Sequence, residues 1–128
     1  MKVLVVDDAA HVRRRFVAMF AAVPGVEAVF EAVDVRDALS ALQTHAPDVV
    51  VLDLHMPGEN GLAFAPRVKL ERPQALLFVV TNDATDAHRR SCLAAGADAF
   101  FDKSRDFDAV VRVVSEAAAA RRPDAGGQ

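Results

Sequence analysis

The sequence predicts an α/β protein of the doubly wound class, built on a five-stranded parallel sheet with five helices. The first observation is that short apolar runs alternate about five times with segments of helical spacing. The second is that several of these runs are nearly all-apolar and rich in Val and Leu, which is typical of parallel strands buried on both faces. Such alternation implies a parallel sheet covered by helices on both sides and joined by right-handed crossovers.

The predicted strands differ in how apolar they are. Three of them are nearly all-apolar: Lys2–Val6, Val49–Leu52 and Leu76–Val80. The run Val26–Ala32 contains Glu27 and Glu31, and charge of this kind is typical of an edge strand, where it discourages stray pairing. Ala99–Phe101 is predicted to be a short last strand.

The first and last helices are predicted by apolar stripes at helical spacing. The stripe of the first helix consists of Val12, Phe16, Met19 and Phe20, which leaves Arg13, Arg14 and Arg15 largely on the other face. We expect these arginines to be either a solvated face or a docking patch for a partner. The stripe of the last helix consists of Phe107, Val110, Val111 and Val114.

Several single residues indicate where helices begin or end. Asp34 is a suitable N-cap for a second helix whose apolar face is Ala38, Leu39 and Leu42. Gly96 follows an apolar segment as a helix-ending glycine does. Pro66 falls inside the predicted third helix, where we expect it either to kink the helix or to delay its start.

Length and composition indicate a single globular domain. The chain has 128 residues, 52% apolar and 26% charged, which suffices for one core. We expect a domain over residues 1–120 and a disordered tail over 121–128, because RRPDAGGQ combines Pro, Gly and charge. The net charge of −3 argues against direct binding of nucleic acid, since phosphate backbones favour strongly basic surfaces.

The sequence also predicts a cytoplasmic location without membrane contact. Cys92 is the only cysteine, which excludes an internal disulfide and fits a reducing compartment. The N-terminal MKVLVVDD lacks the apolar core of a signal peptide. No apolar run approaches the ~20 residues that span a bilayer.

Polar residues follow four of the five predicted strands, at the edge of the sheet where open α/β folds bind ligands. Asp7 and Asp8 end the first strand and Asp53 ends the third. Thr81 ends the fourth strand, and Lys103 follows the fifth. Each alone could be a turn residue or a helix cap, but a coherent set of acids, a hydroxyl and an amine is harder to ascribe to chance.

These residues predict phosphoryl chemistry at Asp53. Three clustered carboxylates repel one another, which raises their pKa values unless a cation is present. Mg²⁺ prefers a few carboxylates together with waters and phosphate oxygens. Asp53 can then act as the nucleophile toward a phosphoryl group and form an acyl phosphate. A metal, a lysine and a hydroxyl donor supply the positioning and charge neutralisation that phosphoryl transfer needs.

The strand order 2-1-3-4-5 is common in doubly wound sheets, and it would place these residues close to Asp53. Asp53 then lies one strand from Asp7 and Asp8 and one strand from Thr81, roughly 5 Å each way. Lys103 lies two strands from Asp53, roughly 10 Å, and its long side chain can cover that distance.

The sequence resembles the receiver domain of two-component response regulators over about residues 1–120. The matching pieces are Asp7 and Asp8 after VLVV, the stretch DLHMPGENG that begins at Asp53, and then Thr81 and Lys103. The DLHMPGENG stretch is highly specific, whereas the acidic pair alone would be weak. The resemblance implies the flavodoxin-like receiver fold.

The resemblance also implies a phosphoacceptor and a metal site. Asp53 would be phosphorylated by a histidine kinase or a histidine phosphotransfer protein. Asp8, Asp53 and the main-chain carbonyl of His55 would hold Mg²⁺, and Asp7 would assist through water. The chain would then be a signalling switch that catalyses only its own phosphorylation and dephosphorylation.

A switch is implied as well. Thr81 and Lys103 would contact the phosphoryl group, and Phe100, at the family's switch-aromatic position, would follow Thr81 inward. Phe100 is also compatible with a plain core role. The face formed by the fourth helix, fifth strand and fifth helix would bind a downstream protein that the sequence does not identify.

Four residues depart from the usual pattern or vary within it. Ser104 replaces the proline that usually follows the lysine, often after a cis bond. A cis bond before serine costs about 2.5–4 kcal/mol instead of about 1. Asn82 replaces the small residue that usually follows Thr81, and we expect its larger side chain to narrow the path by which a phosphoryl group reaches Asp53. His55 and Asp83 occupy positions that tune the lifetime of the phosphorylated state in relatives. The lifetime in this chain therefore cannot be inferred from theirs.

Two other functions compete with the receiver interpretation. An aspartyl-phosphate phosphatase of the haloacid-dehalogenase type has a second aspartate two residues after the nucleophile, where this chain has His55. A nucleotide- or flavin-binding module needs a Gly-rich phosphate loop after the first strand, where Asp7, Asp8 and Ala9 stand instead. The imidazole of His55 is not expected to bind Mg²⁺, and His88 is expected to be an unpartnered surface residue.

Overall fold

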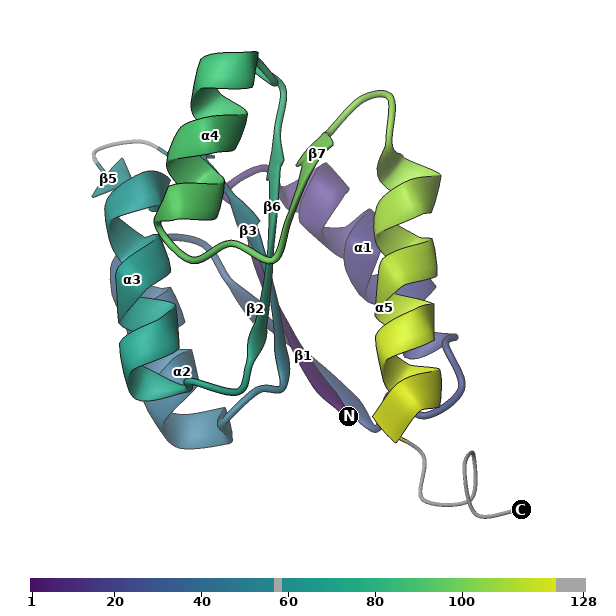
Figure 1. Cartoon of the computed structure of the whole chain (residues 1–128). Coiled ribbons are helices and arrows are strands. Elements are labelled where there is room, and N and C mark those ends of the chain that lie inside the picture. The colour runs from purple at the N-terminus through teal and green to yellow at the C-terminus, as the bar shows by residue number, and fades with distance from the viewer. Residues whose placement is uncertain (57–58, 122–128) are drawn as a thin grey trace.

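The computed structural model describes residues 1–56 and 59–121, and its centre is a five-stranded sheet of order β2-β1-β3-β6-β7 (Figure 1). Every neighbouring pair in this sheet is parallel. Its strands are β1 (Lys2–Val6), β2 (Ala28–Ala32), β3 (Val49–Asp53), β6 (Leu76–Thr81) and β7 (Ala99–Asp102). Counted among themselves along the chain, these strands have the predicted order 2-1-3-4-5, and β2 lies at the predicted edge.

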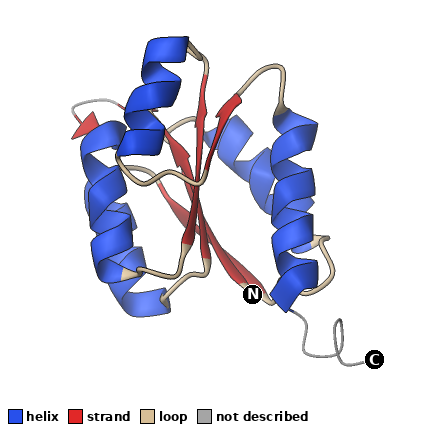
Figure 2. Cartoon of the chain, in the orientation of Figure 1, coloured by secondary structure: helices blue, strands red, loops and turns tan. Residues whose placement is uncertain are grey.

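Five helices cover the two faces of the sheet: α1 (Ala10–Ala21), α2 (Val35–His45), α3 (Gly61–Glu71), α4 (Asp86–Ala94) and α5 (Phe107–Arg121). Helices α1 and α5 pack together on one face, and α2, α3 and α4 line the other (Figure 2). This is the doubly wound α/β fold that the sequence predicts.

The alternation of side chains along each central strand produces two cores. On β1, Leu4 and Val6 point into the core beneath α2, α3 and α4, whereas Val3 and Val5 point into the core beneath α1 and α5. Strands β3 and β6 repeat this pattern, and β1 and β3 are fully buried apart from Lys2. Both faces of the sheet are therefore apolar, which explains the nearly continuous Val and Leu runs.

Two of the predicted helix boundaries are confirmed by their hydrogen bonds and dihedral angles. The Asp34 carboxylate accepts a hydrogen bond from the Asp37 amide at 2.8 Å, so Asp34 caps α2 as predicted. Gly96 follows α4 with φ of 112°, a conformation that L side chains rarely adopt. Helix α3 begins at Gly61, five residues ahead of Pro66, so Pro66 does not delay its start.

The prediction for Met19 was wrong. Phe16 and Phe20 are fully buried, but Met19 is 39% exposed although it was assigned to the same stripe. An α-helix on an open sheet buries one strip of its surface, and the strip of α1 is already filled by the two phenylalanines. They stack on each other, and Phe16 also stacks on Phe107.

A short hairpin precedes α3 and was not predicted. Its strands are β4 (His55–Met56) and β5 (Glu59–Asn60), which pair antiparallel. A strand of two residues is too short to show an alternation of apolar and polar residues, which explains why the sequence did not predict these strands. Pro57 and Gly58 of the DLHMPGENG stretch lie outside the described residues.

The predicted boundary of the tail shifts slightly. Arg121, assigned to the tail, is the last residue of α5, and residues 122–128 lie outside the described part of the chain. Among the residues that the structure describes, no helix combines the length and apolarity needed to cross a membrane.

Candidate functional site

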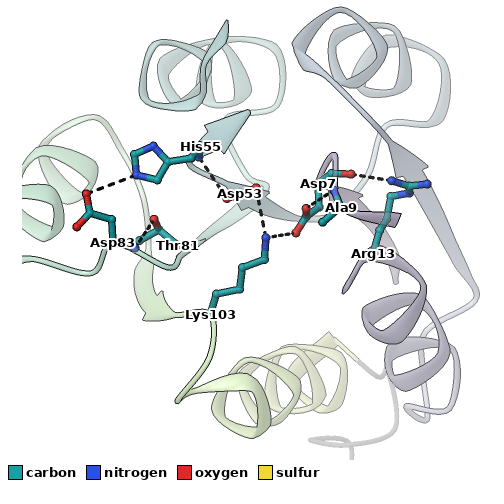
Figure 3. Close-up of polar contacts among 8 residues, drawn as sticks. All are labelled: Asp7, Ala9, Arg13, Asp53, His55, Thr81, Asp83 and Lys103. Atoms are coloured by element: carbon teal, nitrogen blue, oxygen red, sulfur yellow. Dashed lines mark hydrogen bonds and ion pairs between the residues drawn. The ribbon is translucent and has the colours of Figure 1, made fainter. Parts of the chain in front are cut away.

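The structure brings the predicted polar residues together at the carboxyl edge of the sheet (Figure 3). Asp7 follows β1, Asp53 ends β3, Thr81 ends β6 and Lys103 follows β7. Because β3 lies between β1 and β6, Asp53 has the acidic residues on one side and Thr81 on the other. The sequence predicted this arrangement from strand ends alone.

Asp53 is a buried carboxylate at the middle of this edge. Only 4% of the residue is exposed. Its Oδ1 accepts a hydrogen bond from the His55 amide at 3.2 Å, and its Oδ2 lies 3.3 Å from the Lys103 ammonium. Burial raises the pKa of Asp53 above its ordinary 3.8, and the Asp7 carboxylate adds to the rise, while Lys103 and the His55 amide oppose it.

Lys103 reaches Asp53 across two strands and contacts Asp7 as well. Its Nζ lies 2.7 Å from Asp7 Oδ2, and its side chain is only 8% exposed. Burial acts to lower the pKa of Lys103, but the contacts with Asp7 and Asp53 outweigh it and raise the pKa above the ordinary 10.5. The ammonium is therefore held in its charged form between two carboxylates.

Asp7 presents an oxygen that its surroundings do not fully satisfy. Its Oδ1 accepts a hydrogen bond from the Ala9 amide at 2.9 Å. Its Oδ2 is buried and has no hydrogen bond of good geometry among the described residues, although it lies close to Lys103. We therefore describe the Asp7–Lys103 contact as an ion pair rather than a directional hydrogen bond.

The three aspartates form one acidic cluster. A carboxylate oxygen from each of Asp7, Asp8 and Asp53 lies within 4.8 Å of the others. Asp7 and Asp53 are buried, whereas Asp8 is exposed and leaves the cluster open to solvent. Oxygen donors at this spacing, one of them lacking a hydrogen bond, are the donor set that a hard divalent cation requires.

Thr81 and Phe100 are both buried beside the site. Thr81 is fully buried, and its Oγ1 accepts a hydrogen bond from the Asp83 amide at 3.1 Å. Phe100 is 4% exposed and packs in the core beneath α4, with the Arg89 guanidinium 5.2 Å from the centre of its ring. The structure thus places Phe100 inward, and its predicted role as a switch stays a prediction.

Ser104 makes contacts that the more usual proline cannot make. Its amide and its hydroxyl both donate to Asp102 Oδ1, at 2.9 and 2.8 Å. A proline has no amide hydrogen and no hydroxyl. The described residues contain no cis peptide bond, so the Lys103–Ser104 bond is trans. The hydroxyl and amide of Ser104 lower the pKa of Asp102 from its ordinary 3.8.

Arg13 belongs to the surroundings of the site, which the sequence did not reveal. Its guanidinium donates to the main-chain carbonyl of Asp7 at 2.8 Å and to Glu31 Oε1 at 2.8 Å. Arg13 therefore ties α1 and the edge strand β2 to the first residue of the acidic cluster. Nothing in the sequence distinguishes Arg13 from its neighbours Arg14 and Arg15, which are both exposed.

Comparison with known proteins identifies the family. The fold and the edge of polar residues define a doubly wound α/β protein with an acidic site at the end of its sheet. The family model of the response regulator receiver domain matches residues 3–115. The chain therefore belongs to the receiver domain family of two-component response regulators, and neither of the two competing functions is favoured.

Relatives with assigned functions are longer than this chain. A protein-glutamate methylesterase/protein-glutamine glutaminase of Xanthomonas euvesicatoria pv. vesicatoria is 36% identical over 103 residues, which cover 80% of this chain and 29% of that protein. The response regulator GacA of Pseudomonas aeruginosa is 31% identical over 122 residues, covering 95% of this chain and 57% of GacA. The chain thus spans less than a third of the methylesterase and over half of GacA.

Solved structures agree with the fold. A two-component response regulator of the LuxR family from Aurantimonas sp. SI85-9A1 superimposes with a TM-score of 0.83 at 28% identity, covering 98% of this chain and 92% of that one.

Proposed function

We propose that Asp53 accepts a phosphoryl group and that this chain is the phosphoacceptor switch of a two-component pathway. The observation that carries the proposal is the position of Asp53. It is a buried carboxylate at the end of the middle strand, with an acidic cluster on one side and a lysine 3.3 Å away. One carboxylate oxygen attacks phosphorus, the bond from phosphorus to the donor breaks, and the donor leaves with its electron pair.

The acidic cluster is suited to Mg²⁺. Asp8, Asp53 and the main-chain carbonyl of His55 would hold the ion, and Asp7 would act through water. The exposed Asp8 offers an entry for the ion, and the unsatisfied Oδ2 of Asp7 gains a partner when a hydrated cation binds. When bound, Mg²⁺ neutralises charge that develops on the phosphoryl oxygens.

Thr81 and Lys103 would report phosphorylation to the rest of the domain. Hydrogen bonds to charged groups contribute about 1.5–3 kcal/mol each, whereas a switch from 1:99 to 99:1 needs about 5.5 kcal/mol. Lys103 already contacts two carboxylates before phosphorylation, so it exchanges partners and gains less than a new bond would give. Rotation of Thr81 toward the phosphoryl group would weaken the hydrogen bond that its Oγ1 accepts from the Asp83 amide. We therefore expect a partial shift of the population.

The partners follow from the family. Receiver domains exchange phosphoryl groups with histidine kinases or phosphotransfer proteins, and we propose such a protein as the donor for Asp53. We propose the surface of α4, β7 and α5 as the output face, because Phe100 and Lys103 both belong to that side of the site.

Phosphorylation by a small-molecule donor tests the proposal directly. Incubation with acetyl phosphate and Mg²⁺ should add one phosphoryl group, visible by intact mass and lost under conditions that hydrolyse acyl phosphates. Asp53→Asn should abolish the addition, and chelation of Mg²⁺ should suppress it. The matched control is Asp108→Asn, an exposed aspartate on α5, which should be modified like the wild type. Full modification of the Asp53→Asn variant would refute the proposal.

A further inference from the structure

Two histidines and an aspartate meet beside the phosphorylation site without belonging to it. His55 begins β4, Asp83 lies between β6 and α4, and His88 lies in the first turns of α4. One ligand atom from each residue lies within 4.8 Å of the others. The sequence predicted His88 as an unpartnered surface residue, and the lack of partners was wrong, because His88 lies beside Asp83 just ahead of its helix and beside His55 from a distant segment.

We propose that His55, Asp83 and His88 form a binding site for a transition-metal ion of the Zn²⁺ type. His55 Nε2 lies 3.8 Å from Asp83 Oδ2, and His88 Nδ1 lies 3.6 Å from the same oxygen. Ligand atoms about 2.0–2.1 Å from a tetrahedral ion are about 3.3 Å apart. The two nitrogen–oxygen distances therefore exceed the ligand spacing by only a few tenths of an ångström, and the two nitrogens lie within 4.8 Å of each other.

The donor set distinguishes this site from the acidic cluster. Two imidazoles and one carboxylate suit Zn²⁺ and its neighbours in the transition series, whereas Mg²⁺ prefers oxygen donors only. The three side chains are 56%, 59% and 35% exposed, so an ion reaches them from solvent without opening the core. Three protein ligands leave a fourth position for water or another ligand.

Metal binding requires one local change. His88 Nδ1 lies 2.7 Å from the main-chain oxygen of Asp83, a contact in which that nitrogen carries the proton. An ion at the site takes the lone pair of Nδ1 instead, so the imidazole must carry its proton on Nε2. The exchange replaces one exposed hydrogen bond with a metal–ligand bond.

The site would connect the segment that follows Asp53 with the segment that follows Thr81. Figure 3 shows His55 and Asp83 facing one another on the Thr81 side of Asp53. The His55 amide donates to Asp53, and the Asp83 amide donates to Thr81. An ion bound by these side chains would therefore hold the backbone that follows Asp53 against the backbone that follows Thr81.

Zinc titration in the presence of excess Mg²⁺ tests this site. Millimolar Mg²⁺ occupies the acidic cluster and competes poorly for imidazole, so calorimetry with ZnCl₂ should still show one bound ion per chain. His88→Gln and Asp83→Asn should each weaken Zn²⁺ binding at least about tenfold, a loss that even indirect disturbance of metal ligands typically causes. Substitution with Co²⁺ should give a visible absorption band that the same variants lose.

Matched variants make the outcome decisive. His11→Gln removes an exposed histidine elsewhere and should bind Zn²⁺ like the wild type. Circular dichroism confirms that each variant is folded. Equal Zn²⁺ affinity in His88→Gln and the wild type, or complete competition by Mg²⁺, would overturn the proposal. Since the titration needs no phosphorylation, its failure leaves the proposed function of Asp53 untouched.

Discussion

The ammonium nitrogen of Lys103 lies 2.7 Å from Asp7 Oδ2, in an ion pair whose side chains are only 8% and 1% exposed. Lys103 contacts Asp53 at the longer distance of 3.3 Å. Lys103 thus neutralises the charge of Asp7 at least as directly as it neutralises the charge of Asp53. Before phosphorylation its role is to stabilise two buried carboxylates.

Replacing Lys103 with methionine should destabilise the domain. Lys103→Met keeps most of the apolar stem but leaves Asp7 and Asp53 without their buried cation. Breaking a buried ion pair from one side costs about 3–5 kcal/mol, and we expect the lower end because the acidic cluster opens to solvent at Asp8. Urea unfolding at pH 7 with a chelator measures the loss.

Magnesium should distinguish this cause from a packing defect. An added cation replaces the lost charge, so Mg²⁺ should raise the unfolding free energy of Lys103→Met more than that of the wild type. Arg14→Met, an exposed charge on α1, serves as the control and should unfold within about 0.5 kcal/mol of the wild type. A Lys103→Met variant as stable as the wild type would contradict the electrostatic role.

Asp53 should make the domain less stable at neutral pH than an uncharged residue would. Its pKa is raised in the folded state, so between the ordinary value of 3.8 and the folded value the native state binds more protons than the unfolded state. Stability therefore falls as pH rises through that window. Asp53→Asn, which resembles the protonated acid, should raise the unfolding free energy at pH 7 without Mg²⁺.

The pH dependence separates this effect from a general gain in stability. Below pH 3.8 the carboxyl is protonated in both states, so the advantage of Asp53→Asn should disappear there. Urea unfolding at a series of pH values, with Asp108→Asn as the exposed control, measures the difference. An advantage that stays constant down to acidic pH would show that burial of the charge is not its cause.

The sequence predicted the fold well because each strand has its own local pattern of apolar and charged residues, and several strands indicate the same parallel sheet. Buried strands such as Val49–Asp53 are apolar on both faces, and Glu27 and Glu31, before and within β2, identified an edge strand. Met19 was misassigned because helical spacing does not reveal how wide a strip the neighbouring elements cover. The β4–β5 hairpin was missed because it is held by pairing between residues too few to form a pattern.

The site was predictable only as far as strand ends determine it. Parallel strands deliver their final residues to one edge, which brought together Asp7, Asp53, Thr81 and Lys103. The contacts of Arg13 with Glu31, and of His88 with His55, depend on where helices α1 and α4 lie on the sheet. Such helix placement depends on packing across the whole core, which no short motif records.

Gly61 should be essential for the shape of the loop around Asp53. A Cβ at this position would lie 2.7 Å from the Leu54 carbonyl oxygen and 2.8 Å from that of Asp53, and both are backbone atoms that cannot turn away. The Gly61 amide also donates to the Leu54 carbonyl at 3.2 Å, which holds α3 against the end of β3. Gly61→Ala should therefore destabilise the domain by about 1–3 kcal/mol.

The same substitution should disturb phosphorylation as well as stability. Displacement of the Asp53 carbonyl shifts the carboxylate, so modification by acetyl phosphate should slow in Gly61→Ala under conditions where the variant is still folded. Ala63→Met adds a larger side chain at an exposed position of the same helix and should leave both properties near the wild type. Wild-type stability in Gly61→Ala would mean that the backbone relaxes without cost.

Ser104 should control the protonation of Asp102. The Ser104 hydroxyl is the largest cause of the lowered Asp102 pKa, followed by its amide. Ser104→Ala removes the hydroxyl alone, so the pKa of Asp102 should rise toward 3.8 without reaching it. A carboxyl-carbon NMR titration measures the shift, and Ser40→Ala on the exposed surface of α2 should leave Asp102 unchanged.

A proline at the same position extends this test to the loop that carries Lys103. Ser104→Pro removes both donors to Asp102 Oδ1, so the pKa of Asp102 should rise further than in Ser104→Ala. A carboxylate with a lowered folded pKa stabilises the native state above its unfolded value and loses that effect as pH falls through the folded one. Both variants should therefore be less stable than the wild type at pH 7 and equal to it in acid. Equal Asp102 titrations in the two variants would show that the Ser104 amide contributes nothing to this turn.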